Sequence, residues 1–319
     1  MRIALVHDYL REYGGAEKVV EALHELFPEA PIFTAYFNPQ GVLAEKTKDW
    51  DIRTSWIQKI PGAGKLISPF RILAPRAFGS FDLSGFDVVI SSSAIYFAKA
   101  VKTQPHTLHL AYIHTPPRYL YNLATSFNYK KHWWTKVGAE IMNHFLRLVD
   151  FETSQKPDLL IANSENVKQR IEKFYRREAV VIYPPVEVSE LRVKSEEFRV
   201  KEKRYYLSLS RLWKGKGVDV IVQACAQLGL PLKVAGEGPE LENLKRGAGK
   251  FVEFLGQVSD EDKIKLYTEA KALIVAAPEE DFGITVVEAM ACGTPVIALR
   301  EGGYLETIVE SNPSTSSGR

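Results

Sequence analysis

The chain has 319 residues, of which 45% are hydrophobic and 25% are charged. Its length exceeds the roughly 250–300 residues at which a single hydrophobic core stops growing, so two domains are expected. The composition is that of a globular protein and excludes intrinsic disorder, collagen-like repeats and coiled coil. Since 41 Lys and Arg residues face 39 Asp and Glu residues, the net charge of +2 provides no strong field for nucleic acid, and no such partner is expected.

The cysteines and the N-terminal residues indicate the cellular compartment of the protein. Cys225 and Cys292 lie in apolar stretches, which favours buried thiols in a reducing compartment over disulfides or a metal cage. His7 and Asp8 interrupt the N-terminal apolar run before a signal-peptide core forms, and no run reaches the length of a membrane span. We therefore expect a cytoplasmic protein, whose only membrane contact would be peripheral, on the inner face.

The first part of the chain alternates short apolar runs with helical patterns. Strands are predicted at RIALV, FDVVISSS, LHLAYIH, DLLIANS and VVIYPPV, and helices at residues 15–27, 135–153 and 165–175. Continuous apolar strands separated by helices indicate a parallel sheet covered on both faces. A doubly wound α/β domain is therefore predicted over residues 1–185.

Residues 184–204 break this rhythm with two prolines and a charge-dense run, which is typical of an interdomain connection. The alternation then restarts at YYLSLS, LPLKVAG, FVEFLG, ALIVAA and PVIAL. A second doubly wound domain is predicted over 186–310, and 311–319 is predicted to be a disordered tail or a cloning remnant. Ligands of such sheets bind beyond the carboxyl ends of the strands, so the loops there are the candidate sites.

The segment PEEDFGITVVEAMACGTPVIA, residues 278–298, carries two carboxylates around a helix start. Glu280 and Glu288 lie about two helical turns apart, so they can reach two ends of one extended ligand. Gly283 allows close backbone approach, and helix-start amides suit anionic or hydroxyl-rich groups. An acidic cap on a buried helix is the alternative.

A basic loop, SLSRLWKGKGVD, follows the first predicted strand of the second domain. Arg211 and Lys216 both suit phosphate, one as a planar fork and the other as a point charge. Fixed cations here can stabilise negative charge that develops on a phosphate group during a reaction. A solvated loop is the alternative, and Lys214 is expected to be solvated.

Two loops of the first domain also follow strands. Gly14 and Gly15 open a helix, where backbone amides can touch phosphate or a hydroxyl, although an ordinary turn is the alternative. His114 ends a strand, where it can hydrogen-bond a ligand, shuttle a proton or play a structural role. Arg118 is a candidate acceptor contact, and Glu17 is predicted to be a helix-start acid.

Two further patterns do not meet the requirements of the sites they resemble. Gly236 and Gly238 lack the third glycine of a dinucleotide fingerprint, so a strand-to-helix turn is predicted there. Asp260, Glu261 and Asp262 resemble a metal-binding triplet, but a serine precedes them as a helix cap does. No metal site is therefore expected.

Residues 278–298 resemble the signature of retaining glycosyltransferases of family four, in which two Glu residues are separated by seven positions. The resemblance extends over VHDYLREYGGAEKV, IHTPPRYLY, SRLWKGKGVD and EGGYLETIV, and is strongest to GDP-mannose-type mannosyltransferases of surface polysaccharide synthesis. It implies a GT-B fold, with two Rossmann-like domains facing across a cleft. It also implies transfer of a hexose, expected to be mannose from GDP-mannose, with retention, to a glycan or lipid-linked acceptor.

The resemblance also implies roles for individual residues. Glu288 would hold the donor ribose, Glu280 and the Phe282–Gly283 backbone would meet the transferred sugar, and His114 would contact that sugar without being the base. The implied catalytic residues are Glu280, Arg211, Lys216 and His114, and the implied donor-binding residues are Glu288, Phe282, Gly283, Gly14, Gly15, Gly236, Gln257, Val258 and Lys263. No cofactor is implied beyond the nucleotide-sugar co-substrate.

Three expectations remain about the wider protein. Similar enzymes continue past EGGYLETIVE, so the second domain is expected to be truncated. Between Glu45 and Lys136, thirteen Lys or Arg residues against five acids give a net +8, which suits either an anionic membrane surface or a solvated face. The rival functions are a GT-B sugar-nucleotide epimerase or phosphorylase and a non-catalytic glycan-binding partner.

Overall fold

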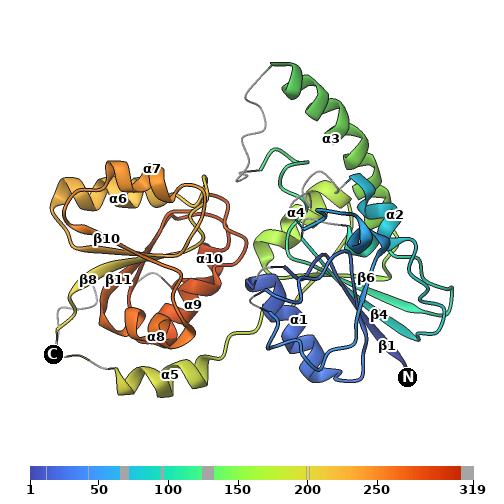
Figure 1. Ribbon diagram of the computed structural model, residues 1–319, viewed down its shortest axis with the longest axis horizontal. Coiled ribbons are helices and arrows are strands. Elements are labelled where there is room, and N and C mark those ends of the chain that lie inside the picture. Colours follow the sequence, from blue (N-terminus) through green and yellow to red (C-terminus); the bar gives the residue numbers. More distant parts are fainter. Residues whose placement is uncertain are drawn as a thin grey trace. The chain divides into compact units, whose positions relative to one another are not determined.

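The computed structural model describes residues 1–11, 13–41, 43–64, 72–94, 97–123, 133–198, 200 and 202–309, with the backbone alone for 133–137. They form two compact units, one comprising the described residues up to Pro185 and the other those from Val186 (Figure 1). Within these ranges, no helix combines the length and apolarity needed to cross a membrane.

The first unit is built on a parallel sheet with the strand order β3-β2-β1-β4-β5-β6-β7. The strands are β1 (Ile3–His7), β2 (Ile32–Thr34), β3 (Ile52–Thr54), β4 (Val88–Ser93), β5 (Leu108–Ile113), β6 (Leu159–Ala162) and β7 (Val180–Val181). The helices and 3₁₀ turns are α1 (Gly15–Leu26), η1 (Trp56–Lys59), α2 (Ala74–Phe78), η3 (Ala98–Ala100), α3 (Trp133–Ser154) and α4 (Glu165–Tyr175).

Helices cover both faces of this sheet because its central strands are apolar on both sides. Successive side chains of a strand point to opposite faces. Ala4 and Val6 therefore share one face, where they join a core with Phe78 of α2. Leu5 points to the other face and packs in a core with Val20 of α1.

The second unit repeats this plan with a parallel sheet in the order β10-β9-β8-β11-β12. Its strands are β8 (Tyr205–Leu209), β9 (Leu232–Ala235), β10 (Val252–Gly256), β11 (Ala270–Val275) and β12 (Val296–Ala298). Its helices are α5 (Val188–Glu197), α6 (Val218–Leu228), α7 (Leu241–Gly247), α8 (Asp260–Glu269), α9 (Ile284–Ala291) and α10 (Tyr304–Thr307).

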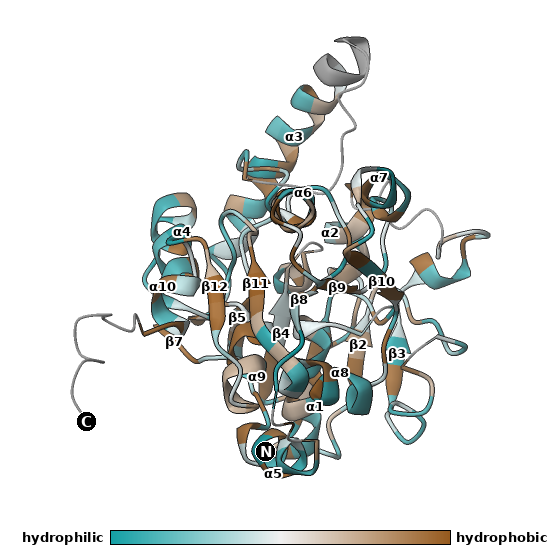
Figure 2. Cartoon of the chain, turned by 90° about the vertical axis from the view of Figure 1, so that its left-hand side faces the viewer, coloured by the Kyte–Doolittle hydropathy of each residue, from teal (hydrophilic) through white to brown (hydrophobic). Residues whose placement is uncertain are grey.

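Two cores hold the second unit together, one on each face of its sheet. Ile221 of α6 and Leu244 of α7 belong to one core, and Tyr267 of α8 and Val286 of α9 belong to the other. Figure 1 shows α6 and α7 on one side of the strands and α8 and α9 on the other. Figure 2 shows β11 in the apolar colour and hydrophilic stretches along α8. The prediction of two doubly wound α/β units is confirmed.

Helix α5 corrects the prediction of a plain connection over residues 184–204. Leu191 of α5 is buried in the same core as Tyr267 and Val286. The charged residues of this segment lie on the outer side of a helix, since Glu190 and Lys194 are half exposed and pair with each other at 2.5 Å. The segment therefore belongs to the second unit as a packed helix.

In each sheet the strand order reverses beside the unit's first strand. β1 lies between β2 and β4, and β8 lies between β9 and β11. Connections leave such a point in opposite directions, which opens a crevice at the carboxyl ends of the strands where ligands bind. β1 ends at His7 and β8 ends at Leu209, so the predicted site loops begin at these two points.

Candidate active site

The two predicted cationic residues lie in the loop between β8 and α6. Lys216 Nζ lies 2.8 Å from Oε2 of Glu280, and the two side chains retain 33% and 17% of their exposure. Arg211, two residues after β8, is exposed. The structure thus brings Lys216 and Glu280 together at the carboxyl edge of the sheet, with a cation and a carboxylate both reachable from solvent.

Glycines set the shape of this loop. Gly217 adopts a φ of +67°, and a Cβ there would lie 2.1 Å from the carbonyl oxygen of Ala276, which follows β11. A left-handed conformation at such close range requires glycine. Gly217 therefore allows the loop after β8 to lie against the chain that leads to Glu280.

Gly236 and Gly238 have the same effect on the other side of the loop. A Cβ on Gly236 would lie 2.0 Å from the carbonyl oxygen of Ser210, and one on Gly238 would lie 2.2 Å from that of Leu212. These contacts flank Arg211 and fix the backbone that carries it. The structure thus gives Gly236 a packing role, and its contact with a donor stays a prediction.

The Glu280 loop is braced by residues 301–303, to which the sequence analysis assigns no site role. Glu279 has a φ of +57°, and its N–H donates to Oε1 of Glu301 at 2.9 Å. The N–H of Gly303 donates to the carbonyl oxygen of Glu280 at 2.8 Å. A Cβ at Gly302 would lie 2.7 Å from that same oxygen. Gly302 and Gly303 therefore lie against the backbone of this loop where a side chain would not fit, and the Glu301 side chain holds the amide of Glu279.

Phe282 and Gly283 lead into α9, as predicted. Phe282 is buried, and Gly283 precedes the helix with a φ of +90°. Glu288 lies in α9 and is 3% exposed. The helix therefore carries Glu288 into the interior of the unit, while Glu280 stays near the surface.

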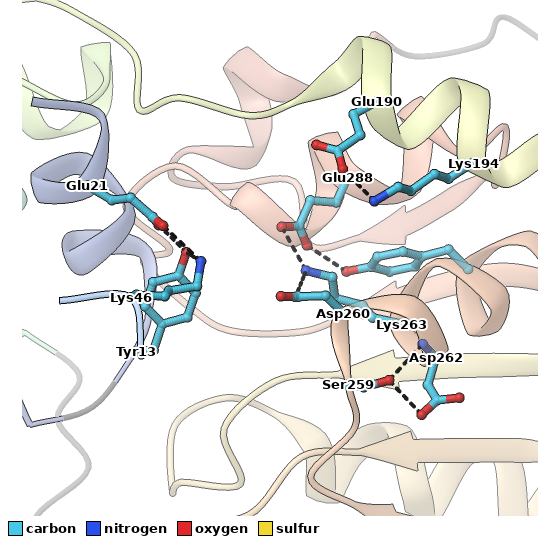
Figure 3. A network of polar contacts seen from close by, with 11 residues as sticks. Tyr13, Glu21, Lys46, Glu190, Lys194, Ser259, Asp260, Asp262, Lys263 and Glu288 are labelled. Carbon is cyan, nitrogen blue, oxygen red and sulfur yellow. Dashed lines mark hydrogen bonds and ion pairs between the residues drawn. The ribbon is translucent and has the colours of Figure 1, made fainter. Parts of the chain in front are cut away.

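The carboxylate of Glu288 is held by two donors from α8. Tyr267 donates its hydroxyl to Oε2 at 3.0 Å, and Lys263 Nζ lies 3.4 Å from Oε1. Figure 3 shows Lys263 between Glu288 and Asp260. Burial lowers the pKa of Lys263, but Glu288 and Asp260 raise it by more, so the net shift is upward. Burial, followed by the neighbouring Glu288, raises the pKa of Tyr267 well above its usual value.

The other predicted nucleotide contacts follow β10. Gln257 is exposed, and Val258 is half-buried against the core that contains Tyr267. Lys263, one turn into α8, is 15% exposed. The structure thus places Lys263 beside Glu288, while a base-binding role for Gln257 and Val258 stays a prediction.

The acidic triplet begins α8, as predicted. Ser259 caps the helix, since its Oγ accepts the N–H of Asp262 at 3.0 Å. Asp260 pairs with Lys263 at 3.1 Å. Within the described ranges, no group of three or more His, Cys, Asp and Glu side chains is arranged to hold a metal ion.

In the first unit, His114 follows β5 and is 8% exposed. Its Nε2 lies 2.8 Å from the Oγ of Ser92, and Ser92 Oγ lies 3.1 Å from Nδ1 of His7. Burial and the neighbouring His7 lower the pKa of His114 to about 3. The imidazole is therefore neutral at physiological pH and acts as a hydrogen-bonding group.

The glycine loop opens α1 with Gly14 as its cap. The N–H of Gly14 donates to Oε2 of Glu17 at 2.8 Å, so this amide is already bonded within the chain. Glu17 is confirmed as a helix-start acid. Its other carboxylate oxygen lies 3.7 Å from Nε2 of His7. Phosphate contact by Gly14 and Gly15 stays a prediction.

Sequence reasoning did not single out His7, Ser92 or Tyr267 as site residues. In the sequence, His7 stands out only as an interruption of the apolar N-terminus. A polar residue at the carboxyl end of each of two neighbouring apolar strands was the available signal for His7 and Ser92. Tyr267 reads as an ordinary core aromatic, so its bond to Glu288 had no sequence signal.

The chain belongs to glycosyltransferase family 4. The family described as "Glycosyltransferase Family 4" matches residues 13–190, and the one described as "Glycosyl transferases group 1" matches residues 190–315. HepE from Anabaena, solved in complex with UDP-glucose, is a structural neighbour with a TM-score of 0.68 and 19% identity, covering 97% of this chain and 84% of that one. At that identity the likeness shows the fold, and the predicted GT-B fold is confirmed.

Curated relatives match parts of the chain. An uncharacterized glycosyltransferase of Methanocaldococcus jannaschii is 28% identical over 159 residues, which cover 48% of this chain and 43% of the relative. A GDP-mannose-dependent alpha-(1-6)-phosphatidylinositol dimannoside mannosyltransferase of Mycobacterium tuberculosis is 31% identical over 107 residues, which cover 33% of this chain and 28% of the relative. The chain thus spans less than half the length of these two relatives.

Proposed function

We propose that the chain is a retaining glycosyltransferase that transfers a hexose, mannose from GDP-mannose, to a glycan or lipid-linked acceptor in the cytoplasm. The observation that carries the proposal is the pairing of Lys216 with Glu280 at the switch point of the second sheet, in a loop that also carries the exposed Arg211. Cations and a carboxylate at this edge suit a sugar diphosphate, whose two ends carry phosphate charge and sugar hydroxyls.

Lys216 and Arg211 would stabilise the leaving nucleoside diphosphate as the glycosidic bond breaks. This role asks for no metal ion and no further cofactor. Glu280 would turn from Lys216 towards the transferred sugar once phosphate takes its place. Glu288, held by Tyr267 and Lys263, would accept hydroxyl hydrogen bonds from the ribose. His114, neutral at working pH, would hydrogen-bond the sugar.

The donor identity rests on two supports of different weight. The Mycobacterium tuberculosis relative is a GDP-mannose-dependent mannosyltransferase, which favours GDP-mannose. HepE was solved with UDP-glucose, which supports a nucleotide sugar as the donor class. We therefore propose a nucleotide sugar as the donor class and GDP-mannose as the specific donor.

The test is slow donor hydrolysis across GDP-, UDP- and ADP-sugars, with the nucleoside diphosphate separated by ion-exchange chromatography. We expect GDP release from GDP-mannose, unchanged by a metal chelator. Turnover restored only by manganese would contradict the metal-independent chemistry. A sugar phosphate formed from inorganic phosphate would favour a phosphorylase, and an epimerised donor would favour an epimerase. Binding without turnover of any donor would favour a glycan-binding partner.

A lipid-linked acceptor would bring the enzyme to a membrane, and α3 supplies a surface for this contact. Ile141, Phe145 and Leu148 are 57%, 60% and 56% exposed. Spacings of four and three residues place them on one helix face, and Figure 2 shows hydrophobic segments along α3. Contiguous exposed apolar side chains mark interaction surfaces. We propose an anionic lipid surface as the partner, because the preceding stretch from Glu45 to Lys136 carries a net +8.

A further inference from the structure

A line of polar side chains crosses three neighbouring strands of the first sheet and ends at His114. Nδ1 of His7 lies 3.1 Å from Oγ of Ser92, and that Oγ lies 2.8 Å from Nε2 of His114. His7 and Ser92 are 2% and 1% exposed, and His114 is 8% exposed. Water competes little for these contacts. Neighbouring protein groups therefore decide which atom donates and which accepts in each hydrogen bond.

The strand register explains why these residues meet. His7 of β1 is the direct partner of Ser92 of β4, and Ser92 is the direct partner of Tyr112 of β5. Directly opposed residues point to the same face of the sheet. His114 comes two positions after Tyr112 and therefore returns to that face. The three polar groups lie on the face covered by α1, whose Val19 packs with Tyr112.

The line begins at a carboxylate. Oε2 of Glu17 accepts the N–H of Gly14 at 2.8 Å, which orients the side chain, and Oε1 then lies 3.7 Å from Nε2 of His7. This separation is longer than a hydrogen bond, but the negative charge of the carboxylate favours a ring proton on the nitrogen that faces it, Nε2 of His7. Nδ1 of His7 then carries a lone pair and accepts the hydroxyl hydrogen of Ser92.

The direction of the hydrogen bond between Ser92 and His114 follows in the same way. Because the Ser92 hydroxyl donates to His7, its oxygen faces His114 as an acceptor, and Nε2 of His114 must donate. We infer that Glu17, His7 and Ser92 are positioning residues that hold His114 in its Nε2–H tautomer, with Nδ1 as the acceptor for a hydroxyl of the transferred sugar. This role rests on the proposed sugar transfer, whereas the tautomer itself does not.

Glu17→Gln tests the direction of the line. The amide oxygen can keep the bond to Gly14, and the amide nitrogen then offers hydrogens to Nε2 of His7. Donor and acceptor then exchange roles in each hydrogen bond from His7 to His114, and His114 should become the Nδ1–H tautomer. Long-range ¹H–¹⁵N spectra of histidine-labelled protein distinguish protonated from unprotonated ring nitrogens. We expect Nε2–H for His114 in the wild type and Nδ1–H in Glu17→Gln. An Nδ1–H tautomer in the wild type, or no change in the variant, would overturn the inference.

The chain offers a matched control on the opposite face of the same sheet. Ser91 Oγ lies 2.9 Å from Nε2 of His109, which is 1% exposed. Ser91→Ala removes a buried serine–histidine bond of the same kind without touching the line to His114. Ser92→Ala and Ser91→Ala should cost comparable thermal stability, and only Ser92→Ala should change turnover. Ser92→Thr keeps a hydroxyl and should retain most of the wild-type rate.

The effect on the sugar is measured with singly deoxygenated donor sugars. Removing the hydroxyl that bonds Nδ1 should lower kcat/KM about threefold to tenfold in the wild type. The same donor should show no such penalty in Ser92→Ala, because the bond is already disturbed. Equal penalties in the two proteins for every deoxygenated donor would remove the catalytic part of the inference. If no nucleotide sugar is turned over, the proposed function fails, while the tautomer measurement still decides the arrangement.

Discussion

Lys216 Nζ lies 2.8 Å from Oε2 of Glu280, although 64 positions separate the two residues in the chain. Each belongs to a loop at the carboxyl end of a central strand, β8 and β11. This ion pair holds both side chains at the switch point of the second sheet. A sugar diphosphate would replace it with two separate interactions, phosphate on Lys216 and sugar hydroxyl on Glu280.

Replacing Lys216 or Arg211 with alanine should lower turnover by about 10²–10³, because a preorganised charge at a developing anion contributes that much. Stability should change by no more than about 1 kcal/mol, since the Lys216 pair is partly exposed. Donor turnover and chemical denaturation measure the two effects. Lys214→Ala, an exposed lysine of the same loop, is the control and should behave as the wild type. Near-normal turnover in both Lys216→Ala and Arg211→Ala would remove the phosphate role.

Tyr267→Phe should weaken nucleotide binding about threefold to tenfold, because it deletes the hydroxyl that orients the Glu288 carboxylate. Glu288→Ala should weaken it further, with calorimetry of GDP binding as the measurement. Glu280→Ala should instead lower turnover while the nucleotide still binds. Equal losses of GDP affinity in Glu280→Ala and Glu288→Ala would show that the two carboxylates have been assigned wrongly.

A buried ion pair gives a stability prediction away from the site. Lys99 Nζ lies 2.5 Å from Asp150 of α3, the two side chains are 1% and 0% exposed, and Tyr121 donates to the same carboxylate at 2.8 Å. Lys99→Met should destabilise the protein by about 3–5 kcal/mol, because it leaves a buried charge uncompensated. The control is Arg53→Met, whose partner Asp51 is 55% exposed, with an expected cost below about 1 kcal/mol. Equal unfolding midpoints for the two variants would contradict this reasoning.

The α3 surface is tested with vesicles. Replacing Ile141 and Phe145 with serine should weaken cosedimentation with anionic phosphatidylglycerol vesicles at least severalfold, because exposed apolar area and basic charge act together at such a surface. Neutral phosphatidylcholine vesicles should bind the wild type poorly. Val220→Ser, an exposed apolar residue of α6, is the matched control. Equal binding of all variants, or concentration-dependent self-association through α3 in place of lipid binding, would refute the membrane role.

Local signals made part of the fold predictable. The helix predicted at 165–175 matches α4 to the residue, because Ser164 caps it and its Oγ accepts the N–H of Val167. The helix predicted at 15–27 ends one residue earlier, at Leu26. The strands β2 and β3 were not predicted, since each has three residues and too short a pattern to read. Helix α5 was missed because charged residues dominate its sequence and few positions face the core.

The residues of the candidate site could be proposed from the sequence, but the contacts among them could not. Motifs identified Lys216, Glu280 and Glu288 individually, but their partners come from distant positions that only the sheet topology brings together. The support of Glu280 by Gly303 and the line from His7 to His114 both depend on register and backbone conformation. Neither leaves a periodic trace in the sequence.

The proposal of nucleotide-sugar transfer is tested most directly by following GDP-mannose hydrolysis by ¹H NMR, in the wild type and in Lys216→Ala, with chelator present. The account predicts GDP together with mannose released first in its α configuration, and at least about a hundredfold slower release from Lys216→Ala. Initial release of the β anomer, or equal rates in the two proteins, would contradict it.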